Sequence, residues 1–175
     1  MSTYGTALVA DLPAGAASAP AGWEHETVEL GGDLVRLVAR SGEIDQVARV
    51  EELLAAAGSG RAAVAEDHDE YGALWVVLSA DHRAVWTVHR RYVLPADPGD
   101  PEAVAAAIED HGGTDPREAD VAGEDAAAAA ARLFGVPTGP MVEAERASAS
   151  AHLELGLVGG PFPWWDALRL PWPGG

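Results

Sequence analysis

Apolar and polar residues alternate along several short stretches of the chain, which is the pattern of a β-strand with one buried face. In residues 34–40, Val35, Leu37 and Ala39 fall on one face and Arg36 falls on the other. Turn residues separate the stretches, so neighbouring strands are expected to form hairpins. The same reasoning predicts further strands over residues 27–30, 61–65, 72–80 and 84–94.

The last two of these stretches differ in pattern. Residues 74–78 are all apolar, which predicts a strand covered on both of its faces. In residues 84–94 the apolar side chains, among them Trp86 and Val88, alternate with polar ones. That strand is therefore expected to bury one face and to form a hairpin with the strand before it.

A helical period appears after residue 40. Apolar residues spaced for one face of a helix predict a helix over residues 43–57, with an N-cap at Ser41 and a stop at residues 58–60. Residues 101–110 predict a second helix, and residues 114–134 a third that is interrupted near Gly123. The apolar stripe of the first helix consists of Ile44, Val47, Val50, Leu54 and Ala57.

The segment that follows Pro140 is ambiguous. Residues 141–146 are compatible with continued helix, but from Ala147 to Leu157 small or apolar residues alternate with polar residues or glycine. We interpret this period of two as a late strand that rejoins the sheet.

Taken in order, these elements predict an α+β protein. We expect a largely antiparallel sheet of about five to six strands, backed on one face by two to three helices. A single domain is expected over residues 23–175, including the Trp/Pro-rich segment 161–175. Residues 1–22 are rich in Ala, Gly, Ser and Pro and predict a flexible arm, with a short strand over 6–10 as the alternative.

The charge limits the partners. The chain has 11 Lys+Arg, all of them arginine, against 28 Asp+Glu, and its formal net charge is -17. This excess of acid argues against nucleic acid and against anionic membranes as partners. It suits a basic partner protein, or solubility alone.

Other absences restrict the chemistry and the compartment. With no cysteine, disulfides, zinc–thiolate sites and thiol catalysis are excluded. Residues 1–21 lack the basic start and apolar run of a signal peptide, and no stretch is long and apolar enough to span a membrane. We therefore expect a cytoplasmic protein.

The acidic segment 66–70 is the first candidate for chemistry. Together with His82 and His89 its carboxylates are of the types that hold a divalent metal. Its spacing matches neither an EF-hand nor an HExxH motif, so a solvated loop is the preferred interpretation. We expect no metal and no cofactor.

A basic cluster on residues 83–91 is the second candidate. Arginines there could receive a carboxylate or phosphate, although pairing with neighbouring acids inside the chain is the simpler interpretation. If the protein binds a small molecule, we expect His89 and Arg91 to bind it, close to Trp86. Ser79 lacks the Gly-x-Ser-x-Gly context of a catalytic serine, and we expect no enzyme activity.

The aromatic C-terminal segment offers two interpretations. Tryptophan is enriched in binding hot spots, so Trp164, Trp165 and Trp172 are candidate partner contacts. Because exposed apolar peptides are usually avoided, the simpler interpretation is that these rings fold back and complete a core that is poor in large side chains.

The function class predicted from these observations is a protein-binding module that acts by occlusion. It is most like an immunity protein or antitoxin that neutralises a basic toxin, because a negative surface speeds association with a basic one. The alternatives are a scaffold subunit that docks through the aromatic segment, and a small-molecule-binding domain. The expected partner-binding residues are Glu66, Asp67, Asp69, Glu70, Trp164, Trp165 and Trp172.

Overall fold

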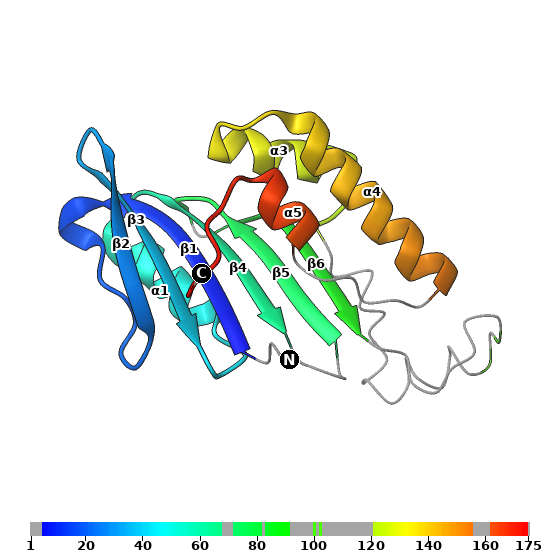
Figure 1. The fold of residues 1–175 in the computed structure, drawn as a ribbon, viewed down its shortest axis with the longest axis horizontal. Coiled ribbons are helices and arrows are strands. Elements are labelled where there is room, and N and C mark those ends of the chain that lie inside the picture. Colours follow the sequence, from blue (N-terminus) through cyan, green and yellow to red (C-terminus); the bar gives the residue numbers. More distant parts are fainter. Residues whose placement is uncertain are drawn as a thin grey trace.

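The computed structural model describes residues 5–67, 72–81, 83–91, 100, 102, 121–155 and 162–174, and its elements are drawn in Figure 1. The strands are β1 (Gly5–Pro13), β2 (Glu24–Gly31), β3 (Leu34–Ser41), β4 (Arg61–Asp67), β5 (Gly72–Leu78) and β6 (Ala84–Arg91). The helices are α1 (Val47–Ala57), α3 (Glu124–Phe134), α4 (Thr138–Leu155) and α5 (Phe162–Ala167), with a 3-10 turn at Ala14–Ala16.

The six strands form one sheet in the order β2-β3-β1-β4-β5-β6. Every neighbouring pair is antiparallel, as in the pairs Val9↔Val38 and Val9↔Ala63 that β1 makes with β3 and β4. The α+β class and the antiparallel sheet predicted from the sequence are confirmed.

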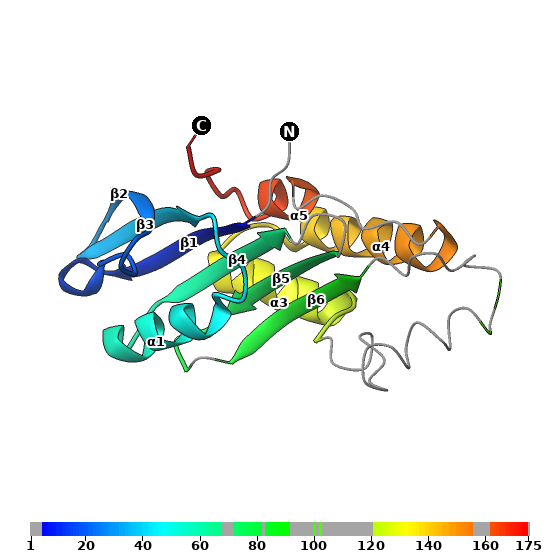
Figure 2. The ribbon, with the colours of Figure 1, turned by 90° about the horizontal axis from the view of Figure 1, so that it is seen from below.

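Both faces of the sheet are covered, as Figure 2 shows from the side. Helices α3, α4 and α5 lie on one face, where they bury a cluster that includes Trp75, Trp86 and Trp165. Helix α1 lies on the opposite face with Trp23 and a cluster of smaller aliphatic side chains. The sequence predicted two to three helices on one face. Of the three helices found there, only α3 corresponds to a predicted helix, and α1 lies on the opposite face, where no helix was expected.

The flexible arm predicted for residues 1–22 is wrong for β1. This strand is internal, and its Leu8 and Val9 are fully buried on opposite faces. A strand buried on both faces needs no alternation of apolar and polar residues, so its pattern resembles an unstructured Ala-rich segment. The alternative strand at 6–10 had the right place but was too short.

The late strand predicted from Ala147 to Leu157 is also wrong. Residues 138–155 form helix α4, and residues 156–161 lie outside the described part of the chain. Between residues 147 and 151 the alternation is only between alanine and serine, which differ little in burial energy. Alanine has the highest helix propensity, so local preference favours the helix.

The first predicted helix exists but is shorter than expected. Asp45 has a φ of 60°, in the left-handed region, so the helix cannot include the residues before it and begins at Val47. Val50 and Leu54 are buried as the stripe predicted, and Gly58 ends the helix. The start of α3 at Glu124 agrees with the predicted interruption; the helix predicted over 101–110 lies outside the described residues.

Candidate protein-binding surface

Strand β2 forms one edge of the sheet and is exposed along its whole length. All eight of its residues, Glu24–Gly31, are exposed to solvent. Its inner edge pairs with β3, and no described segment pairs with its outer edge. The outer backbone N–H and C=O groups of β2 are therefore available to another chain.

The register with β3 assigns the side chains of β2 to two faces. Glu26 pairs with Val38, which belongs to the core under α5, so Glu26 points to the α3–α5 side. Thr27 pairs with Leu37, which belongs to the core under α1, and points to the other side. By alternation, Glu24 and Val28 share the face of Glu26.

Among the described residues, one glutamate of this edge, Glu24, has an ion-pair partner. The Nε of Arg40 donates to Glu24 at 2.6 Å, and both side chains are largely exposed. Within the described residues, Glu26 and Glu29 have no ion-pair partner. The edge therefore keeps an uncompensated negative charge.

Exposed apolar side chains adjoin these acids. Val28 is 48% exposed, Leu30 42% and Leu34 41%, which makes them the large aliphatic side chains most exposed in β2 and β3. The strand edge thus combines free backbone groups, negative charge and a small apolar patch.

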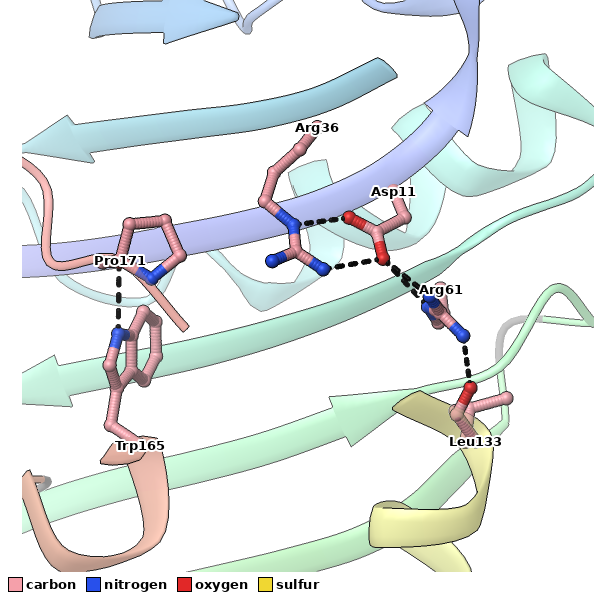
Figure 3. Close-up of polar contacts among 6 residues, drawn as sticks. All are labelled: Asp11, Arg36, Arg61, Leu133, Trp165 and Pro171. Carbon is pink, nitrogen blue, oxygen red and sulfur yellow. Dashed lines mark hydrogen bonds and ion pairs between the residues drawn. The ribbon is translucent and has the colours of Figure 1, made fainter. Parts of the chain in front are cut away.

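The neighbouring strands are held rigidly by a buried carboxylate (Figure 3). Asp11 on β1 is 2% exposed and accepts hydrogen bonds from Arg36 on β3 at 2.6 and 2.9 Å and from Arg61 on β4 at 2.8 Å. Burial alone would raise the pKa of Asp11, but the hydrogen bonds and positive charges of Arg36 and Arg61 outweigh burial and lower it. This cluster links three strands on the α3–α5 side of the sheet.

The same cluster reaches the end of α3. Arg61 also donates to the carbonyl oxygen of Leu133, and its guanidinium lies 5.0 Å from the ring centre of Phe134. A cation at the C-terminus of a helix complements the helix dipole. Arg61 is thus fully engaged within the fold, so this cluster is structural rather than a binding site.

The C-terminal tail covers the sheet beside β3. The indole Nε1 of Trp165 donates to the carbonyl oxygen of Pro171 at 3.0 Å, which fixes the chain after α5 (Figure 3). Gly174 then lies against the guanidinium of Arg40. The tail ends beside β3 and does not reach the outer edge of β2 in the described residues.

Glu66, predicted as an exposed partner contact, is instead buried. It is 1% exposed, and its carboxylate accepts hydrogen bonds from the backbone N–H groups of Asp45 at 3.1 Å and Gln46 at 2.6 Å. These groups lie at the N-terminal end of α1, which has no acidic residue in its first turn. Glu66 therefore satisfies backbone donors that the helix itself cannot pair.

Its burial has a signal in the sequence. Ala62 and Val64 precede it at intervals of two on the face covered by α1, so Glu66 continues the inward face of β4. Asp67 is half-buried at the end of this strand, and Asp69 and Glu70 lie outside the described residues. Glu66 therefore does not contribute to the predicted acidic patch at 66–70, and a role for Asp69 and Glu70 in binding stays a prediction.

Trp164 and Trp165 are core residues. They are 3% and 1% exposed, and Trp164 lies 5.1 Å from Trp86 between ring centres. The simpler interpretation, that these rings complete the core, is correct for Trp164 and Trp165, and their role as exposed partner contacts is wrong. Trp172 is half-buried, 5.3 Å from Trp165, and its contact with a partner stays a prediction.

His89 and Arg91 lie two residues apart on β6, and their role in binding a small molecule stays a prediction. His89 on β6 is half-buried and has a contact within the fold, and the side chain of Arg91 lies outside the description. Arg83 pairs with Asp81 at 3.5 Å, as internal compensation predicts. In the part of the chain that is described, no group of metal-ligating side chains gathers. No described helix is long and apolar enough to cross a membrane.

Comparison with known proteins finds no protein family, no curated protein and no solved structure that matches this chain.

Proposed function

We propose that this protein is a non-catalytic binding module that captures a basic partner protein and acts by occlusion, in the manner of an immunity protein or antitoxin. The observation that carries this proposal is the open edge of β2, with Glu26 and Glu29 uncompensated beside exposed apolar side chains. An edge of this kind is a site at which proteins pair with other proteins.

The use of arginine in the fold supports the same function. Arg36 and Arg61 are engaged by Asp11, Arg40 by Glu24, and Arg146 by Glu124. With Arg83, which pairs with Asp81, five arginines are committed to internal ion pairs among the described residues, while most described acidic side chains are exposed. A negatively charged surface steers a basic protein toward it and disfavours association with acidic proteins.

The test is a pull-down from the native host with tagged full-length protein, at low salt and at high salt. Each captured protein is identified by mass spectrometry, purified and mixed with the chain. The proposal expects a basic protein that forms a defined complex, weakened at least tenfold from about 50 to 300 mM salt. Its own activity, for example toxicity to cells, should be inhibited in the complex.

Two results would contradict the proposal. One is a partner that is acidic or neutral and binds equally at both salt concentrations. The other is a basic partner whose activity is unchanged in the complex, which would remove occlusion. Loss of the partner in a Trp172→Ala variant that circular dichroism shows to be folded would indicate the scaffold function instead.

A further inference from the structure

We infer that the outer edge of β2 binds an extended basic segment of the partner as an additional strand of the sheet. This inference rests on the proposed function and names the part of the partner that is recognised. It begins with the backbone: an edge strand carries a row of N–H and C=O groups with no partner in the sheet, and an extended chain satisfies them.

The shape of the edge permits this pairing. β2 is exposed along all eight residues, and the C-terminal tail ends beside β3, against Arg40. A register shift between Glu29 and Gly31 disturbs only the end of the strand. Residues 24–29 therefore present a regular edge that no described segment covers.

The charges of the edge select the incoming strand. Glu24 and Glu26 share one face of β2, and Glu29 lies on the other. A second copy paired symmetrically about Glu26 would set the two Glu26 side chains directly opposite each other, and like charges there destabilise the pair. A strand with arginine or lysine across from Glu26 forms a pair of opposite charges, so the charges favour a basic segment over a copy in that register.

The apolar side chains define the rest of the segment. Val28 follows Glu26 on the same face and lies diagonal to the exposed Leu34 of β3. Aliphatic residues at the matching position of the incoming strand would cover this patch. The expected segment is therefore extended, with basic residues at one end and at least one aliphatic residue at the other.

The experiment uses the full chain and a fluorescent peptide as long as β2. One face of the peptide carries arginine in one half and valine in the other, and its other face is threonine. Two further peptides carry N-methyl groups on alternate residues, one on the even residues and the other on the odd. In a strand, alternate amides point to opposite edges, so only one of these patterns blocks pairing with β2.

Binding is measured by anisotropy at about 150 mM salt, where charges far from each other are screened. One methylated peptide should lose affinity by about tenfold or more, because several ladder hydrogen bonds are lost together. The other should bind within about threefold of the parent peptide. Equal affinities of all three peptides would overturn strand addition and indicate charge attraction alone.

Variants of the protein locate the peptide. Glu26→Gln with Glu29→Gln should weaken binding, and Glu52→Gln with Glu143→Gln, at exposed positions on α1 and α4, is the control that removes the same charge. Since both sets lie on the surface, circular dichroism should show all variants folded. Equal loss in the control would place the peptide elsewhere. Dimers of the peptide-free chain in sedimentation would indicate that a second copy occupies the edge.

The two proposals fail separately. If no peptide binds but a basic partner is captured and inhibited, the proposed function stands and its use of β2 is wrong. If the peptides bind as expected but no basic partner is inhibited, the edge is a peptide site and occlusion is wrong.

Discussion

The two edges of the sheet differ in how the chain protects them. At β6, Trp86 and Val88 are buried, and the N–H of Thr87 donates to the carbonyl oxygen of Val121 at 2.9 Å. At β2 the whole strand is exposed, and charged side chains take the place of covering chain. Among the described residues, the fold thus covers β6 with its own backbone at Thr87 and leaves the edge at β2 open.

Because of this difference, the residues that stabilise the fold lie near β6, and the residues proposed to bind the partner lie on β2. The β6 side carries the aromatic layer, whose loss would expose the largest side chains of the protein. The β2 side contributes little buried surface, because its side chains remain in water. We therefore expect substitutions near β6 to change the free energy of unfolding, and substitutions on β2 to change binding alone.

Trp86→Ala, on the β6 side, should have the largest effect on the free energy of unfolding. Trp86 stacks on Trp75 and donates its indole N–H to the buried Glu145 at 3.0 Å. The substitution removes a large buried ring and leaves a carboxylate short of a donor, for a loss of about 3–5 kcal/mol in the free energy of unfolding. Urea unfolding measures it, and Trp86→Phe, which removes the donor but keeps a ring, should lose about half as much. A loss below about 1 kcal/mol for the alanine variant would contradict the assigned core.

Asp11→Asn should cost about 2–3 kcal/mol, because it leaves Arg36 and Arg61 without their counter-charge. The pKa of Asp11 lies below its ordinary value of 3.8, so its ion pairs stabilise the fold fully above that pH. This stabilisation is lost as the pH falls through the lowered pKa. Unfolding at several pH values should therefore show a constant gap between wild type and variant at neutral pH that narrows in acid; a gap that widens in acid would refute this assignment.

Trp165→Phe should loosen the C-terminal tail at a smaller cost. It removes the hydrogen bond to Pro171 and leaves most of the buried ring, for a loss of about 1 kcal/mol. Limited proteolysis should cut the tail sooner in the variant than in wild type. Unchanged cleavage would indicate that burial of Leu168 and Leu170 holds the tail without this bond.

Glu26→Gln with Glu29→Gln should have the smallest effect on stability. Both side chains are exposed and have no ion-pair partner among the described residues, so the free energy of unfolding should change by less than about 0.5 kcal/mol. The partner's association rate should fall, since steering depends on these charges. Stopped-flow association at two salt concentrations measures this rate. An unchanged rate would show that the charges of Glu26 and Glu29 do not steer the partner to β2.

The sequence predicts elements well where one face alone is buried. The alternation in β3 and the helical stripe of α1 reflect a contrast between core and water. β3 lies where the pattern places it, and α1 ends where predicted but begins later, at Val47. β1 carries no such contrast because Leu8 and Val9 face two different cores. In residues 147–151 alanine alternates with serine, and both are small, so the alternation is a weak signal for a strand. The high helix propensity of alanine favours a helix in this segment.

Candidate site residues are harder to predict because burial depends on distant partners. Glu66 looks like surface acid in the sequence, but the N-terminus of α1, some twenty residues earlier, provides the donors that allow it to be buried. Trp164 and Trp165 look like an exposed aromatic segment until Trp75 and Trp86 supply rings for them to contact. Glu26 and Glu29 are not distinctive until the strand order puts β2 at an edge.

The most direct measurement of the central claim is amide hydrogen exchange of the two edges by NMR, without and with the arginine–valine peptide. In the free protein the Thr87 amide should exchange slowly, whereas alternate amides of β2 should exchange as fast as unstructured chain. Addition of the peptide should slow those β2 amides and leave Thr87 unchanged. Slow exchange throughout β2 in the free, monomeric protein, or no change in β2 with saturating peptide, would contradict an open edge that receives a basic strand.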